Sequence, residues 1–176
     1  MGRGRPTNAS HPETEMRFMA QLAEGKKAPL FTLPANTGDK IALKDFRGEC
    51  KVVLYFYPRD NTSGCTKEAC SFRDLKTAFK RAGAVILGVS TDDLQSHDKF
   101  AAKNNLSFPL LSDTDAKVAT KYGVWQEKKM YGKTHMGIVR TTFVIDVEGT
   151  IRKIWPKVKV DQHADEVLEV VKALGS

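Results

Sequence analysis

A cysteine lies where a predicted strand gives way to a predicted helix, and this position favours thiol chemistry. The apolar run Val52–Tyr57 indicates a buried strand, and residues Cys65–Ala82 indicate a helix. Cys65 therefore lies at a helix N-terminus, where unpaired N–H groups and the positive end of the helix dipole stabilise an anion. Because the thiolate is the reactive form of cysteine, the sequence predicts Cys65 as a nucleophile. The alternative is an inert buried thiol.

Donor groups next to this thiol could polarise a bound substrate. The backbone N–H groups of Gly64 and Cys65 lie at the predicted helix start, and Thr62 supplies a hydroxyl three residues before the thiol. A lowered thiol pKa gives only a modest gain in rate, so positioned donors must supply the rest.

The spacing of three residues resembles a known active-site motif. Pro58, Thr62 and Cys65 follow the pattern Pro-x-x-x-Thr-x-x-Cys, which resembles the active-site motif of the peroxiredoxins. The continuation Gly-Cys-Thr-x-Glu-Ala-Cys-x-Phe-Arg-Asp over residues 64–74 is similar to the bacterioferritin comigratory protein, or Q-type, branch of that family. The similarity extends over residues 22–174 and includes the segments 28–34 and 138–146.

The resemblance implies a thiol-dependent peroxidase with a thioredoxin-like fold. Hydrogen peroxide and organic hydroperoxides would oxidise Cys65 to a sulfenic acid, and Cys70 would then form an intramolecular disulfide with Cys65. Thioredoxin or a similar dithiol protein would reduce that disulfide. The resemblance implies no metal, haem or flavin cofactor and a monomeric protein.

The resemblance also assigns roles around the sulfur. Arg140 would place a fixed cation beside it, and Pro58 would shield the site. The residues expected to bind the substrate are Gly64, Thr62 and Arg140.

Each of these residues has a plainer interpretation. Pro58 could merely end the strand, and Thr62 could merely stabilise the turn. Arg140 could face solvent, although a charge within an apolar strand needs a partner, and the Cys65 thiolate could be that partner. The plainer interpretation of Cys70 is a second buried cysteine on the helix.

Other site types fit the sequence less well. Cys50 matches no position of the family pattern and is interpreted as a structural or weakly reactive thiol. Zinc binding is not predicted, because Cys65 and Cys70 are five residues apart and the four histidines are scattered. A thiol–disulfide oxidoreductase on the same fold is the nearest alternative enzyme, but the sequence has no Cys-x-x-Cys pair.

The charge and cysteine content limit the class of protein. Lys and Arg number 28 against 21 Asp and Glu, giving a net charge of +7. A basic domain that binds nucleic acid or another anionic partner is therefore the alternative from a different class. The charges are scattered without a nucleic-acid motif, so we expect a solvated basic surface and no nucleic-acid partner. Three cysteines, no secretory signal and no membrane-length apolar run predict a cytoplasmic protein without a membrane partner.

The wider pattern predicts an α/β fold with a mixed central sheet flanked by helices. Residues 1–19 are interpreted as a disordered or tag-like extension, and residues 20–176 as a single thioredoxin-like domain. Further strands are predicted at Ala84–Ser90 and Val139–Asp146, the latter pairing with Thr150–Trp155 across a tight turn. The other helices are predicted over residues 93–104, with Asp92 as the cap, 115–122 and 164–174.

Overall fold

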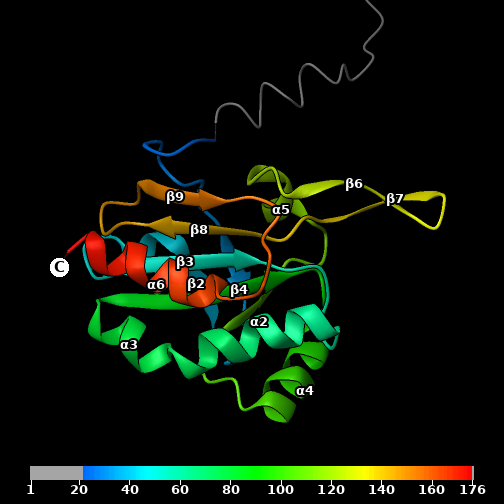
Figure 1. Cartoon of the computed structure of the whole chain (residues 1–176), viewed down its shortest axis with the longest axis horizontal. Helices are drawn as coiled ribbons and strands as arrows, with labels where there is room; N and C mark the ends of the chain where they lie inside the picture. Colours follow the sequence, from blue (N-terminus) through cyan, green and yellow to red (C-terminus); the bar gives the residue numbers. More distant parts are fainter. Residues whose placement is uncertain (1–21, 176) are drawn as a thin grey trace, which may run out of the picture.

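The computed structural model describes residues 22–175, and a five-stranded mixed sheet organises them (Figure 1). The strand order is β5-β4-β3-β8-β9. Strands β3, β4 and β5 are parallel, whereas β8 is antiparallel to both of its neighbours. The strands are β3 (Lys51–Phe56), β4 (Ala84–Ser90), β5 (Leu110–Ser112), β8 (Thr141–Ile145) and β9 (Ile151–Trp155).

Strand β3 lies at the centre of the sheet, and every one of its residues is buried. Because successive strand residues point to opposite faces, β3 contributes to two separate apolar layers. Leu54 and Phe56 belong to one layer, and Val53 and Tyr55 to the other. A central strand buried on both sides explains the continuous apolar run in the sequence.

Helices cover both faces of this sheet unequally. Residues of α2, α3, α4 and α6 pack in the layer that contains Tyr55. The other layer is covered by α5, by the short β1-β2 hairpin and by a 3₁₀ turn. The bounds are β1 (Thr32–Pro34), β2 (Lys40–Ala42), η1 (Leu43–Phe46), α2 (Ser63–Asp74), α3 (Lys76–Arg81), α4 (Leu94–Asn104), α5 (Lys117–Lys121) and α6 (His163–Ala173).

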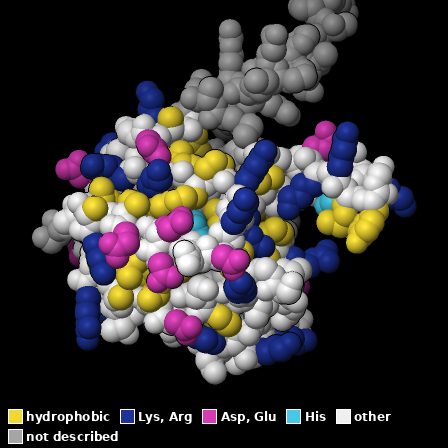
Figure 2. Space-filling view, viewed as in Figure 1, with side chains coloured by type: hydrophobic (Ala, Val, Ile, Leu, Met, Phe, Trp, Pro, Cys, Tyr) yellow, Lys and Arg dark blue, Asp and Glu magenta, His cyan; other side chains and the backbone are white. Residues whose placement is uncertain are grey.

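A two-stranded hairpin projects from the body of the molecule (Figures 1 and 2). Strands β6 (Trp125–Met130) and β7 (Lys133–Ile138) pair antiparallel along their whole length. Tyr131 and Gly132 form the turn, and both have positive φ angles. The sequence did not predict these strands, since lysine-rich segments without an apolar face give no strand signal.

The predicted α/β fold with a mixed sheet is confirmed, but two helix boundaries differ. The predicted helix over residues 65–82 is two helices, α2 and α3, which separate at Leu75. The cap of α4 is Asp93, whose carboxylate accepts a hydrogen bond from the Ser96 N–H at 2.8 Å. Asp92, the cap predicted from sequence, instead accepts the backbone N–H of Asp60.

The predicted extension of residues 1–19 lies outside the described residues, so its division from a domain of residues 20–176 stays a prediction.

Among the helices of residues 22–175, none has the length and apolar character needed to cross a bilayer.

Candidate active site

Cys65 lies in the first turn of α2, directly after the turn that leaves β3. Asn61 adopts a left-handed conformation with φ of 64°, and Thr62 is extended, so the chain reverses before the helix begins at Ser63. The N–H of Thr66 bonds back to the Thr62 carbonyl. The N–H groups before it therefore lie at the open, positive end of the helix. The Cys65 thiol is 1% exposed, so these dipoles act where water does not screen them.

Arg140 supplies a cation to this buried sulfur. Its Nη2 donates to Cys65 Sγ at 3.2 Å, and its Nη1 donates to Glu68 Oε1 at 2.7 Å. Burial alone would lower the pKa of Arg140, but its electrostatic interactions and hydrogen bonds with Glu68 and Cys65 outweigh this effect and raise it. The guanidinium thus bridges the thiol and a carboxylate as a permanent positive charge.

The backbone position of Arg140 differs from the sequence prediction. Arg140 does not lie within a buried strand, because β8 begins at Thr141 and β7 ends at Ile138. The Val139 N–H bonds to the Val124 carbonyl, and the Arg140 carbonyl accepts from the Val158 N–H. These bonds fix the connection on both sides, so the guanidinium reaches the sulfur from a rigid segment.

Glu68 is a functional candidate that the sequence reading missed. It lies one turn after Cys65 on the same side of α2 and is 1% exposed. Burial raises the pKa of Glu68 to about 7, although Arg140 opposes the shift. Its Oε2 atom has no hydrogen-bond partner among the described residues. The signal in the sequence was an acidic residue three positions after the thiol, which shares its helix face.

Gly64 provides the space that Arg140 occupies. A Cβ atom at Gly64 would lie 3.2 Å from Arg140 Nη2. This contact is tighter than ordinary van der Waals packing, so a side chain here would displace the guanidinium. The structure therefore gives Gly64 a steric reason to remain a glycine besides its N–H group.

Thr62 and Pro58 lie in the turn before the helix. The Thr62 hydroxyl donates to the Arg59 carbonyl at 3.0 Å, so its proton is already engaged. Its oxygen can act as an acceptor, whereas the sequence reading treated this hydroxyl as a donor. Pro58 is half-buried where the chain leaves β3.

The two other cysteines lie apart from this arrangement. The Cys70 thiol is half-buried and faces Asn104 Oδ1 at 3.9 Å, near the end of α4. Cys50 immediately precedes β3, and burial, with Glu49 beside it, raises the pKa of its thiol. A raised pKa lowers the thiolate fraction, which agrees with the weakly reactive role predicted for Cys50.

Lys128 of the projecting hairpin is a second basic side chain that interacts electrostatically with Cys65. Burial lowers its pKa, Arg140 lowers it further, and Cys65 opposes the shift. Its side chain lies over Gly137, where a Cβ atom would meet the lysine Cδ at 3.3 Å. Lysines also mark the exposed part of the hairpin in Figure 2.

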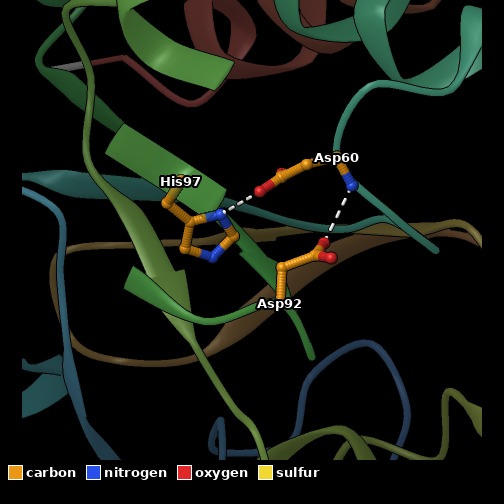
Figure 3. Close-up of side chains that lie close together, drawn as sticks. All are labelled: Asp60, Asp92 and His97. Atoms are coloured by element: carbon orange, nitrogen blue, oxygen red, sulfur yellow. Dashed lines mark hydrogen bonds and ion pairs between the residues drawn. The ribbon is translucent and has the colours of Figure 1, made fainter. Parts of the chain in front are cut away.

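One group of residues has side chains close enough to be tested as a metal site. Ligand atoms of Asp60, Asp92 and His97 lie within 4.8 Å of one another (Figure 3). Groups within the protein already bond these atoms: both His97 ring nitrogens and both Asp60 oxygens have hydrogen-bond partners, and Asp92 Oδ2 accepts two hydrogen bonds. The group is therefore built as a hydrogen-bond network.

Comparison with known proteins identifies the family. The model of the AhpC/TSA family matches residues 24–154. A putative peroxiredoxin Bcp of Coxiella burnetii is 54% identical over 144 residues, which cover 82% of this chain and 95% of the relative. The chain is a peroxiredoxin of the AhpC/TSA family. Peroxiredoxin Bcp of Bacillus subtilis is 49% identical over 86% of this chain and 96% of its own.

Solved structures agree with this assignment. The bacterioferritin comigratory protein of Xanthomonas campestris, studied for alkyl peroxide reduction, matches with a TM-score of 0.78 and 43% identity. The match covers 83% of this chain and 92% of that protein. A peroxiredoxin Q of Xylella fastidiosa gives a TM-score of 0.82 at 38% identity, over 87% of this chain and 97% of its own. The predicted Q-type branch and thioredoxin-like fold are confirmed, and this peroxiredoxin is a thiol-dependent peroxidase.

Replacing Arg140 tests the cation beside the sulfur. We expect Arg140→Met to slow the first oxidation of Cys65 by about 100-fold, or roughly 2.7 kcal/mol of barrier, and to lower the thiolate fraction at a given pH. Arg140→Lys should recover part of the loss, because lysine restores the positive charge but not the planar guanidinium that binds Cys65 and Glu68 at once. Single-turnover kinetics and thiolate absorbance measure both effects. Arg152→Met is the control, since Arg152 is an exposed partner of Asp146. Equal rates in Arg140→Met and the wild type would contradict the role.

The raised pKa of Glu68 predicts a pH-dependent stability. The carboxyl stays protonated in the folded protein up to about pH 7, whereas its ordinary value is 4.5. Folding therefore binds a proton in this window, and the free energy of unfolding falls as pH rises through it. Relative to Glu68→Gln, the wild type should lose about 1–3 kcal/mol between about pH 4.5 and pH 8.

Urea unfolding at several pH values measures this difference. The matched control is Glu169→Gln, because Glu169 is exposed on α6 and should give a curve parallel to the wild type. A Glu68→Gln curve that also runs parallel to the wild type would show that Glu68 ionises normally.

Proposed function

We propose that Cys65 is the thiol that reduces hydroperoxides in this peroxidase. The observation that carries the proposal is the 3.2 Å contact from Arg140 Nη2 to a buried sulfur at a helix N-terminus. The thiolate attacks one peroxide oxygen, the O–O bond breaks, and the other oxygen leaves with its electron pair and takes up a proton. Cys65 becomes a sulfenic acid, and the substrate becomes water or an alcohol.

The surrounding groups support this step in complementary ways. Arg140 and the N–H groups of Gly64 and Cys65 stabilise negative charge on sulfur and on the departing oxygen. The Thr62 oxygen, whose own proton is engaged by Arg59, can accept the O–H of the peroxide. Pro58 limits access by water at the edge of the turn. Organic hydroperoxides are included as substrates because the Xanthomonas relative was studied with alkyl peroxide.

We propose that Cys70 resolves the sulfenic acid. Attack of the Cys70 thiol on the Cys65 sulfur would form a disulfide and release water. Thioredoxin, or a similar dithiol protein, would return both thiols by exchange. A monomer in the cytoplasm remains our working proposal for the state in which this occurs.

The geometry of α2 requires the helix to open before the disulfide forms. Five residues along an α-helix separate the Cα atoms by about 8.6 Å, and the side chains point about 140° apart. A disulfide tolerates a Cα separation of at most about 7 Å. The two thiols also face different groups, Arg140 and Asn104. At least one turn of α2 must therefore unwind in each cycle.

A nucleic-acid function gains no support from the arrangement of charge. Lys and Arg side chains are dispersed over the face shown in Figure 2, with Asp and Glu among them. Nucleic-acid binding usually concentrates basic groups on one face. We therefore propose no nucleic-acid partner.

Cysteine variants separate the two proposed roles. Cys65→Ser should lose peroxide reduction, because it removes the nucleophile. Cys70→Ser should react once and stop, leaving a sulfenic acid that a dimedone probe can trap. Cys50→Ser is the matched control and should retain full turnover with thioredoxin. Sustained turnover by Cys70→Ser would show that another thiol resolves the intermediate.

Hydrogen exchange tests the unwinding of α2. Oxidation to the disulfide should remove protection over residues 65–73, while residues of α3 keep most of theirs, since α3 starts after the break at Leu75. Mass spectrometry should first confirm the Cys65–Cys70 bond. Equal protection in the reduced and disulfide forms would contradict the unwinding.

A further inference from the structure

The turn between β3 and α2 is held by a buried polar network whose members do not touch Cys65 or Arg140 in the contacts described above. Asp60, in the middle of this turn, is 4% exposed. Its Oδ1 accepts from the Tyr57 hydroxyl at 2.6 Å, and its Oδ2 accepts from the Ser96 hydroxyl at 2.9 Å. His97 Nδ1 lies 2.7 Å from the same Oδ2 (Figure 3).

His97 links this carboxylate to the sheet. The ring is fully buried in α4, and its Nε2 lies 3.0 Å from the Leu111 carbonyl of β5. A carbonyl oxygen only accepts hydrogen bonds, so Nε2 carries a proton. The carboxyl group of Asp60 faces Nδ1, so both ring nitrogens have hydrogen-bond partners. The turn is therefore tied to α4 and, through His97, to β5.

The backbone of Asp60 is held as well. Its N–H donates to Asp92 Oδ2 at 2.8 Å, and the Ser90 hydroxyl donates to the same oxygen at 2.6 Å. Asp92 follows the end of β4, so a third element holds the turn. Because the side chain and the backbone of one residue are both fixed, the chain direction at Asn61 and Thr62 is fixed too.

We propose that Asp60 and His97 are positioning residues for the peroxide step. The proposal rests on the function assigned to Cys65 above, since Thr62 and Cys65 follow Asp60 by two and five residues. The unwinding of α2 frees the chain on the C-terminal side of Cys65 in every cycle. The Asp60–His97 network holds the N-terminal side, so the Thr62 oxygen and the helix start return to the same place when α2 re-forms.

The energetics favour an anchor of this kind. Removing one partner from a buried, hydrogen-bonded pair of polar groups is unfavourable, because the other group is left without its hydrogen bond. A network in which each member is satisfied also makes its parts rigid. The turn can thus stay ordered under conditions in which α2 opens.

Two substitutions of His97 test the proposal, because each keeps one of its two hydrogen bonds. The amide nitrogen of Asn can occupy the place of Nδ1 and keep the bond to Asp60. The amide nitrogen of Gln can occupy the place of Nε2 and keep the bond to Leu111. Single-turnover oxidation of Cys65 by hydrogen peroxide and the melting temperature are measured for both variants.

We expect His97→Gln to slow oxidation about tenfold and His97→Asn to stay within about threefold of the wild type, at similar melting temperatures. A merely structural His97 would give two variants whose rates match each other or follow their stability. That outcome, or an unchanged rate in His97→Gln, would overturn the proposal. If the wild type itself shows no oxidation of Cys65, the assigned function fails instead.

A milder pair of variants decides the matter if the His97 variants do not fold. Tyr57→Phe removes one bond to Asp60, and Tyr122→Phe removes a similar bond to the Pro29 carbonyl on the other layer of the core. We expect Tyr57→Phe to slow oxidation of Cys65 about threefold or more and Tyr122→Phe to leave it unchanged. Equal rates in the two variants would overturn the proposal.

Discussion

The contact of the half-buried Arg140 guanidinium with Cys65 and Glu68 is the interaction on which the site depends. A partly buried cation needs polar partners, and α2 provides them one turn apart as the Cys65 sulfur and the Glu68 carboxyl group. The neighbouring carboxylate orients the guanidinium but competes for its charge, and burial keeps that competition small by favouring the protonated form of Glu68.

In the proposed cycle, the same helix must be stable enough to build the site and weak enough to open. Cys65 and Phe72 are buried in the apolar layer of α2, whereas Cys70 lies half-buried beside α4. The break at Leu75 separates α2 from α3, so opening one helix need not unfold the other. Local stability is thus divided along the chain, which suits an element that moves during catalysis.

The sequence predicted the candidate reactive residues of the site better than the residues that contact and position them. Cys65 at a helix start, Thr62 before it and a lone arginine at position 140 were visible from residue type and spacing. Their partners were harder to see, because Glu68 and Asp60 are ordinary acidic residues until distant elements approach them. The hairpin β6-β7 was missed for a related reason, since its strands bury little apolar surface.

By itself, the sequence determined the alternation of strands and helices, the placement of Cys65 at a helix start and the family. Local patterns of apolar residues and short motifs decide these features, and they need no knowledge of contacts. Only the tertiary structure decided that Arg140 meets Cys65 across 75 positions, that Cys70 lies beside Asn104 of α4, and that His97 bonds to Asp60 in the turn. Contacts between residues far apart in the chain depend on how the sheet and helices pack, and no local pattern records that packing.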